Sequence, residues 1–295
     1  MSSFEPEQNV GLARLTTIGT GGPARWFARP RTSAELQAAL HWAEERKVAV
    51  EVIGLGSNVL VHDDGVEALV LRLEGELAAV EIVGSTLSAG GGATNAVCLH
   101  RARDADLGGF EFASAIPGTV GGGTRMNAGA YGRDWSDVLI DATVVAADGS
   151  RTVGVDGLGL SYRHSNLRPG EVVAHARFAL ESRPAGEVKA HVAELLAQRK
   201  ATQPTNRRTF GSVFKNPAHE LGAGRMLDDC GLKGYVIGGA RISPVHANFI
   251  ENAGGASSAD AIALMAEARS RVHERFGVVL EHEVRFLGPL ELPVL

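Results

Sequence analysis

Apolar residues recur along this chain with two different periods, one typical of helices and one typical of strands. In residues 33–46 they fall at helical spacing, behind a capping box that Thr32 and Glu35 are expected to form. Residues 47–53, "KVAVEVI", instead alternate apolar and polar positions, which predicts a strand. The apolar face of the first helix is expected to contain Leu36, Ala39, Leu40 and Ala43.

The same patterns predict the other main elements. Strands are expected on both sides of an Asp64–Gly65 turn, and a hairpin around Asp148 and Gly149. One helix is expected after the glycines of 90–92 and ends at Gly108–Gly109. A second is expected over 186–199, with one apolar face formed by Val188, Val192, Leu195 and Leu196. A third begins at a Ser257–Asp260 cap and ends at Gly277, with an apolar face formed by Ile262, Met265, Ala268 and Val272. The alternation in "VVLEHEVRFLG" predicts one closing strand over 278–288.

This order of elements indicates an α+β fold, because helices and strands do not alternate regularly as in a doubly wound sheet. The helix that ends near Gln203–Pro204 marks the predicted domain boundary. We expect an N-terminal domain over 1–187, with two subdomains that divide near 75, and a C-terminal domain over 188–295.

The amino-acid composition limits the kinds of partner and ligand that we expect for this chain. With 29 Lys and Arg against 34 Asp and Glu, the formal net charge is −5, and no basic run would neutralise a row of phosphates. No nucleic acid is expected as a partner. The polar N-terminus "MSSFEPEQNV" and the lack of an 18-residue apolar run lead us to expect a soluble cytoplasmic protein without membrane insertion. Two cysteines and ten histidines without an HxxxH or HExxH pair predict no metal site.

Glycine is unusually frequent, at 37 of 295 residues, or roughly 13% against the usual ~7%. It clusters in "IGTGGPA", "GLGSN", "AGGGA" and "IPGTVGGG". Such clusters are either tight turns or loops that bring backbone close to a ligand, and successive amides in glycine turns can bind a diphosphate. GLGSN lacks the GxGxxG and the following helix of a Rossmann site, and no GxxxxGK[ST] occurs.

Eight ordered motifs carry a family resemblance. They are "TTIGTGGPA", "GLGSNVLVHDDG", "IPGTVGGGTRMNAGAYG", "SYRHS", "GSVFKNP", "AGRMLDDCGLKG", "GGARISPVHANFIEN" and "LEHEVRFLG". Over about 16–288 the chain resembles the UDP-N-acetylenolpyruvoylglucosamine reductases, also called UDP-N-acetylmuramate dehydrogenases. With 48 residues between Arg163 and Ser212 and no tyrosine-bearing insertion, it is similar to their shorter, second type.

The resemblance implies an FAD-binding domain of the vanillyl-alcohol-oxidase (PCMH) type, followed by a C-terminal α+β substrate domain. It implies FAD as cofactor, NADPH as reductant, UDP-N-acetylglucosamine enolpyruvate as substrate, and a cytoplasmic step of peptidoglycan synthesis. We also expect a monomer. Thr124, Arg125 and His282 depart from the family pattern, and none of them is a predicted catalytic residue.

The resemblance also implies the site residues. Taken alone, Ser212 is read as a turn hydroxyl sooner than as a proton donor, and Arg163, Glu281 and Glu283 are read as solvated side chains. The family pattern makes Ser212 the general acid, places Arg163 on the substrate carboxylate and selects Glu283, which spacing does not separate from Glu281. Substrate contacts are implied for Asn216, Lys215 and Asn248, although from the residues alone Lys215 is either an electrostatic support or a solvated side chain. Cofactor contacts are implied for Gly54, Leu55, Gly56, Ser57, Asn58, Ile116, Pro117, Gly118, Gly121, Gly122 and Arg285.

Two rival functions stay open at this point. One is an oxidase of the same flavin-binding architecture, which fast reoxidation by oxygen would favour. The other is a non-catalytic module that binds UDP-sugars or flavin, which binding without NADPH consumption would favour.

Overall fold

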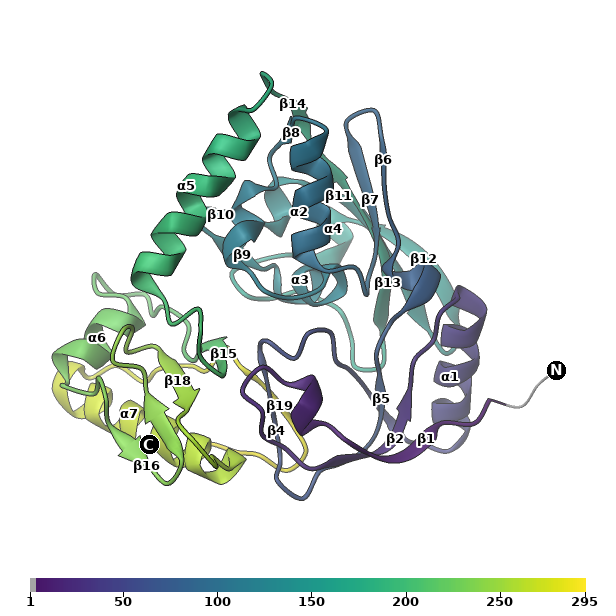
Figure 1. Cartoon of the computed structure of the whole chain (residues 1–295). Helices are drawn as coiled ribbons and strands as arrows, with labels where there is room; N and C mark the ends of the chain where they lie inside the picture. Colours follow the sequence, from purple (N-terminus) through teal and green to yellow (C-terminus); the bar gives the residue numbers. More distant parts are fainter. Residues whose placement is uncertain (1–3) are drawn as a thin grey trace. The chain divides into compact units, whose positions relative to one another are not determined.

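A computed structural model describes residues 4–295, and it has two compact units. Of the described residues, unit 1 comprises 4–8, 26–55 and 68–199, and unit 2 comprises 9–25, 56–67 and 200–295. Each unit therefore contains segments that are far apart in the sequence. Helices and strands are mixed along the chain, as Figure 1 shows, so the predicted α+β class is confirmed.

Unit 1 is built around a five-stranded antiparallel sheet of order β12-β11-β13-β7-β6. Its strands are β6 (Val80–Val83), β7 (Thr86–Gly90), β11 (Leu139–Ala146), β12 (Gly149–Gly154) and β13 (Val172–Ala179). The helices of this unit are α1 (Ser33–Glu45), α2 (Asn95–Asp104), α3 (Val120–Met126), α4 (Val155–Leu158) and α5 (Glu187–Thr202), the last of which ends in unit 2. Buried residues of α2, α3 and α5 share one core with the sheet, centred on Trp135, Phe110 and Phe178.

Shorter elements complete unit 1. A four-stranded sheet has the order β1-β2-β5-β3. Its strands are β1 (Glu7–Gly11), β2 (Pro23–Ala28), β3 (Ala49–Val52) and β5 (Val66–Leu71). Strand β3 lies wholly in unit 1, whereas each of the other three has residues in both units. Two further pairs are β8 (Leu107–Gly108) with β14 (Glu181–Ser182), and β9 (Gly129–Ala130) with β10 (Arg133–Asp134). Single 3₁₀ turns are η2 (Gly75–Ala78), η3 (Glu111–Ala115) and η4 (Trp135–Asp137).

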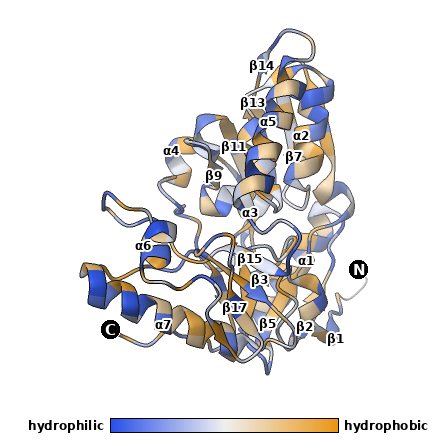
Figure 2. Ribbon diagram, turned by 60° about the vertical axis from the view of Figure 1, so that its left-hand side comes forward, coloured by the Kyte–Doolittle hydropathy of each residue, from blue (hydrophilic) through white to orange (hydrophobic). Residues whose placement is uncertain are grey.

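Unit 2 packs a small sheet against a long helix. The sheet has the order β15-β18-β17-β16, and β19 pairs in parallel with β4. The elements are η1 (Ala13–Leu15), β4 (Val59–Val61), β15 (Thr209–Ser212), α6 (Ala223–Asp229), β16 (Val236–Ile237), β17 (Ala240–Ile242), β18 (Phe249–Asn252), α7 (Ser258–Phe276) and β19 (Arg285–Leu287). Figure 2 shows hydrophobic and hydrophilic residues interleaved along α7, and its buried residues join Phe210, Val213 and Ile250 in one core.

The locally encoded elements are confirmed. Ser257 and Asp260 form a complete capping box at α7, and Gly277 ends this helix in the left-handed conformation. The apolar face of α1 is buried as predicted, and the predicted hairpin forms between β11 and β12, whose last pair, Ala146↔Gly149, encloses Ala147 and Asp148. Helix α5 ends just before the predicted stop at Gln203–Pro204.

Several expectations were wrong in detail. The Glu35 carboxylate accepts from the Arg31 N–H instead of the Thr32 N–H, so only half of that capping box forms. Helix α2 ends at Asp104, before Gly108. Strands β4 and β5 do lie on both sides of the Asp64–Gly65 turn as predicted, and they belong to different sheets. Leu196 is 45% exposed, although the other three predicted apolar residues of α5 are buried.

The closing strand is also shorter than predicted. Of 278–288, only Arg285–Leu287 forms a strand, in parallel with β4, while His282 makes an isolated bridge to Phe214. Alternation alone cannot set the strand's length, because a strand also needs a partner along its whole edge. The chain bends at Val284, between the two partners.

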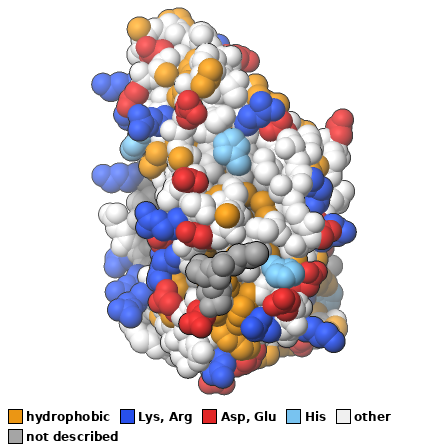
Figure 3. All heavy atoms as spheres, turned by 90° about the vertical axis from the view of Figure 1, so that its right-hand side faces the viewer, with side chains coloured by type: hydrophobic (Ala, Val, Ile, Leu, Met, Phe, Trp, Pro, Cys, Tyr) orange, Lys and Arg blue, Asp and Glu red, His pale blue; other side chains and the backbone are white. Residues whose placement is uncertain are grey.

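Acidic and basic side chains are interspersed on the face drawn in Figure 3, so this face has no large patch of one charge.

Among residues 4–295, no helix is long and apolar enough to cross a membrane.

Candidate active site

The GLGSN loop connects β3 to β4, as predicted from the strand patterns on both sides. The boundary between the two units falls inside this loop, between Leu55 and Gly56. On the unit 1 side, Gly54 lies against Thr119, because a Cβ added at Gly54 would be 2.5 Å from Thr119 Oγ1. The first predicted cofactor loop therefore lies beside the second, IPGTVGGG, within unit 1.

The IPGTVGGG loop is held by Asn95, the first residue of α2. The Asn95 side chain donates to Ile116 O at 3.0 Å, and its backbone N–H donates to Gly118 O at 3.0 Å. The Gly121 N–H is engaged by Gly91 O at 2.8 Å. Gly122, by contrast, is exposed, and a Cβ there would meet nothing closer than Thr119 Oγ1 at 3.6 Å. Gly122 thus presents exposed backbone to an incoming ligand.

Two buried oxygens adjoin this loop without a hydrogen-bond partner among the described residues. They are Asn95 Oδ1 and Ser114 Oγ. Buried polar atoms are nearly always paired in native proteins, so an orphan beside a ligand loop indicates a bound group or water that completes it. The exposed backbone of Gly122 and the two orphan oxygens fit a polar cofactor such as FAD.

On the unit 2 side, Gly56 is fixed by close packing. Its φ is +63°, and a Cβ would lie 2.1 Å from Leu15 O, so only glycine fits. Thr17 anchors the turn by donating its backbone N–H to Gly56 O at 3.1 Å. Asn58 then joins the turn to the C-terminal segment, because its side chain donates to Glu283 O at 3.1 Å and its carbonyl accepts from Arg285 N at 3.0 Å.

Ser212 ends β15, and Glu283 lies on the segment beside it. The Glu283 N–H donates to Val213 O at 2.8 Å, and Lys215 N donates to Glu281 O at 2.9 Å. Unit 2 therefore brings Ser212, Glu283 and Arg285 together with the Ser57–Asn58 end of the GLGSN loop. Ser212 and Glu283 are both partly buried.

The residues predicted to bind substrate also support the local backbone. The buried Asn248 side chain pairs with both backbone groups of Phe214: Oδ1 accepts from its N–H at 2.9 Å, and Nδ2 donates to its C=O at 2.8 Å. Asn216 Oδ1 accepts from Ala223 N at 3.0 Å, which caps α6. Lys215 Nζ lies 3.4 Å from Glu281 Oε2. Their substrate contacts stay predictions.

Arg163 belongs to unit 1, whereas Ser212 and Glu283 belong to unit 2. It lies in a tight turn in which Ser161 and His164 exchange both backbone hydrogen bonds. Its φ is +55°, a left-handed value that few residues other than glycine, asparagine and aspartate adopt. Nη2 donates to Gly129 O at 2.7 Å, and the guanidinium lies 5.1 Å from the Tyr162 ring centroid. Strained backbone of this kind is concentrated at functional sites.

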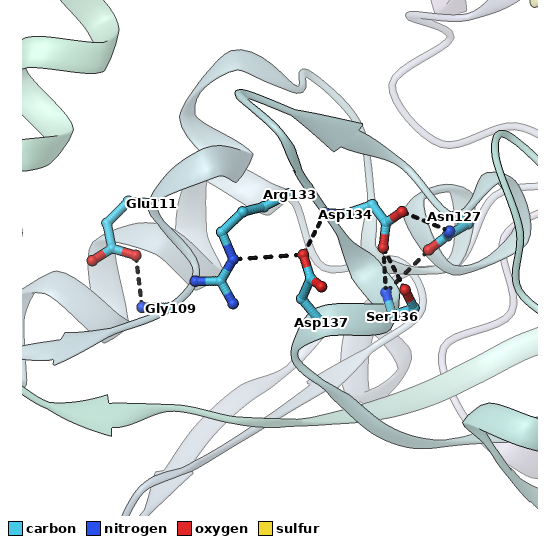
Figure 4. Close-up of polar contacts among 7 residues, drawn as sticks. All are labelled: Gly109, Glu111, Asn127, Arg133, Asp134, Ser136 and Asp137. Carbon is cyan, nitrogen blue, oxygen red and sulfur yellow. Dashed lines mark hydrogen bonds and ion pairs between the residues drawn. The ribbon is translucent and has the colours of Figure 1, made fainter.

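The turn of Arg163 is supported by Asn127, a residue that the sequence analysis did not single out. Asn127 ends α3 in the left-handed conformation and is 1% exposed. Its Nδ2 donates to Ser161 O at 3.1 Å and to Asp134 Oδ2 at 3.0 Å, and its Oδ1 accepts from Ser136 N. Figure 4 shows the Asn127 carboxamide facing Asp134 and Ser136. The only sequence signal for this role was an asparagine before the glycines of "NAGAYG", where a left-handed helix end is expected.

Comparisons with known proteins give two family matches along the chain. A profile of the FAD binding domain matches residues 24–153, and a profile of the UDP-N-acetylenolpyruvoylglucosamine reductase C-terminal domain matches residues 203–287. These matches define a protein with an FAD-binding domain and a separate C-terminal domain. The predicted cofactor loops GLGSN and IPGTVGGG both fall within the first match.

Relatives extend over nearly the whole chain. The UDP-N-acetylenolpyruvoylglucosamine reductase of Agathobacter rectalis is 41% identical, with 95% of this chain and 93% of the relative covered. Reductase 2 of Symbiobacterium thermophilum is 43% identical, with 94% and 90% covered. A crystal structure of the Thermus caldophilus reductase superposes with a TM-score of 0.83 at 36% identity, covering 96% of this chain and 99% of that one. The chain belongs to the UDP-N-acetylenolpyruvoylglucosamine reductase family.

Proposed function

We propose that this chain catalyses the NADPH-dependent reduction of UDP-N-acetylglucosamine enolpyruvate to UDP-N-acetylmuramate, with FAD as its cofactor. The observation that carries the proposal is the 41–43% identity to named reductases over 94–95% of the chain. The reaction is a cytoplasmic step of peptidoglycan synthesis, on which cell shape and cell division depend. We propose that the protein acts as a monomer, with the domains over 1–187 and 188–295.

The reaction adds a hydride to the terminal carbon of the enol ether and a proton to its α-carbon. NADPH gives up the hydride and becomes NADP⁺, so the two electrons are balanced. Bound FAD supplies the two-electron carrier between the nicotinamide and the enol ether. The residues of this chain have three further tasks: to hold the cofactor, to stabilise the negative charge that grows beside the substrate carboxylate, and to deliver the proton.

The cofactor would be held by the two glycine loops. Ile116, Pro117, Gly118, Gly121 and Gly122 would contact it from one loop, and Gly54 to Asn58 from the other. The unpaired oxygens at Asn95 and Ser114 support this assignment, since a polar cofactor would supply their missing donors. The guanidinium of Arg285 would contact the cofactor from the segment that Asn58 fixes in place.

Ser212 would deliver the proton to the α-carbon. A serine hydroxyl is a weak acid, so neighbouring groups must stabilise the alkoxide that it leaves. Glu283, held beside Ser212 by the hydrogen bond to Val213 O, would orient the substrate and support proton delivery. The guanidinium of Arg163 would bind the substrate carboxylate, because its planar fork matches a carboxylate and its charge stabilises the enolate-like transition state. Asn216, Lys215 and Asn248 would contact the remainder of the substrate.

Replacing Ser212 by alanine tests this assignment. Removal of a general acid typically slows the step it serves by about 10²–10⁴-fold. We expect that loss in the transfer from reduced enzyme to the enolpyruvyl sugar, measured by anaerobic stopped-flow absorbance of the flavin. Reduction by NADPH is expected to be unchanged, because it needs no proton from Ser212.

A matched control is Thr205→Ala, which removes an exposed hydroxyl from the turn before β15. Both of its half-reactions are expected to match the parent enzyme. If Ser212→Ala slowed flavin reduction by NADPH as much as it slowed turnover, the proton-donor role would be wrong.

A further inference from the structure

The strand that carries Ser212 contains one residue too many for its partner. Strand β15 pairs with β18 at Thr209↔Glu251 and at Ser212↔Phe249, so three steps along β15 match two steps along β18. Gly211, next to Ser212, has a φ of +78°. A glycine in the left-handed conformation at an extra residue defines a β-bulge, a feature that redirects the side chains that follow it.

The bulge changes which way the chain faces at Ser212. In a regular strand, residues 210 and 212 lie on the same face. Phe210 is completely buried in the core of unit 2, so a regular strand would direct Ser212 into that core as well. With the bulge, Val213 takes the next core position at 1% exposure, and Ser212 is partly exposed.

Hydrogen bonds on both sides hold the residues that follow Ser212. These bonds fix the one-residue register shift that the bulge introduces. On one side, Glu283 N and Glu281 O pair with Val213 and Lys215. On the other side, Asn248 pairs with Val213 through its carbonyl and with Phe214 through its side chain. Ser212 lies between the bulge at Gly211 and the segment Val213 to Lys215, which is hydrogen-bonded on both sides. A change of backbone conformation at Gly211 therefore has to be absorbed at Ser212.

We infer that Gly211 is a positioning residue that turns the Ser212 hydroxyl out of the core and toward the substrate. The requirement is one of backbone conformation, because a Cβ at position 211 would lie 3.4 Å from Ser57 O, an ordinary contact. This inference rests on the proposed function for its kinetic consequence, while its structural part does not.

The test compares Gly211→Ala with Gly211→Asn, since asparagine tolerates left-handed backbone better than alanine does. Gly231→Ala is the matched control: Gly231 is also in unit 2, has a φ of +70°, and a Cβ there would meet nothing within 4 Å. Displacement of a reacting group by about 1 Å costs on the order of 10²-fold in rate. Gly211→Ala is expected to slow hydride transfer to the enolpyruvyl sugar by about that factor, with NADPH reduction within about 2-fold of the parent.

Gly211→Asn is expected to keep most of the transfer rate, and Gly231→Ala all of it. Equal slowing of both half-reactions by Gly211→Ala would overturn the inference, and so would the same selective slowing by Gly231→Ala. If Gly211→Ala does not fold, Gly211→Asn decides: near-parental transfer supports the inference, and a selective loss as large as that of Ser212→Ala overturns it.

A second readout is independent of activity. Ser212→Cys places a thiol at this position, and its alkylation by N-ethylmaleimide reports whether the side chain is accessible. Cys98 is buried and Cys230 is partly buried, so the parent protein gives the background rate. We expect the added thiol to react at least about 10-fold more slowly when Gly211→Ala is also present, because alanine disfavours the left-handed bulge. Equal alkylation rates would overturn the inference, whereas slower alkylation in an enzyme that reduces no enolpyruvyl sugar would overturn only the proposed function.

Discussion

Replacing Asn248 by alanine removes the two hydrogen bonds that its side chain makes to the backbone N–H and C=O of Phe214. Asn248 is 5% exposed and Phe214 is 2% exposed, so the freed N–H and C=O of Phe214 would be shielded from water. Each buried backbone group left without a partner costs about 1–3 kcal/mol. The free energy of unfolding should therefore fall by about 2–6 kcal/mol, a large share of the ~5–15 kcal/mol that stabilises a typical domain.

Urea unfolding followed by circular dichroism measures this loss. Tryptophan fluorescence separates the two units, because Trp26, Trp42 and Trp135 all belong to unit 1. Asn206→Ala is the control, since Asn206 is an exposed asparagine in the turn before β15. A change below about 0.5 kcal/mol for Asn248→Ala, the size typical of neutral surface substitutions, would show that the backbone of Phe214 does not depend on this side chain.

Two further predictions concern pH. Hydrogen bonds from the backbone of Ser257 and Gly239 lower the pKa of Asp260 below its usual 3.8. Its contribution is therefore present above pH 3.8 and lost as pH falls through the lower folded value. Asp260→Ala should cost about 1 kcal/mol at pH 7 by thermal unfolding, with the difference from the parent shrinking below pH 3.8; a difference that stayed constant would contradict this capping role. Burial lowers the pKa of His246 below 6.5, and its Nδ1 accepts from Asn248 N at 3.2 Å. Because the unfolded chain takes up the proton first, the free energy of unfolding should decrease as pH falls below 6.5, and His246→Gln should weaken that dependence; an unchanged pH profile in the variant would count against it.

Features encoded within a few residues were predictable from the sequence. The cap of α7 needs only Ser257, Asp260 and Gly277, all of which act within one turn of the helix end. The strands around GLGSN were likewise predicted from alternation alone. Such features depend on local backbone preferences, which neighbouring residues determine.

Features that need two distant segments were not predictable. The bulge at Gly211 exists only relative to β18, and the pairing of Asn248 with Phe214 depends on where two strands stop. The family resemblance selected Ser212, Arg163 and Glu283, but it did not indicate how their backbones are held. Arg163, with its φ of +55°, depends on Asn127, which lies 36 positions earlier in the chain. A side chain that bonds across such a separation leaves no periodic signal.

As a proposed enolpyruvyl reductase, this chain is expected to carry out both half-reactions. The most direct measurement is the visible spectrum of the FAD-loaded protein under anaerobic conditions, first with NADPH and then with UDP-N-acetylglucosamine enolpyruvate. We expect flavin bands that bleach with NADPH and return when the enolpyruvyl sugar is added. Flavin that bleaches but returns only when oxygen is admitted would instead identify an oxidase. A protein that binds the sugar without oxidising NADPH would identify a binding module.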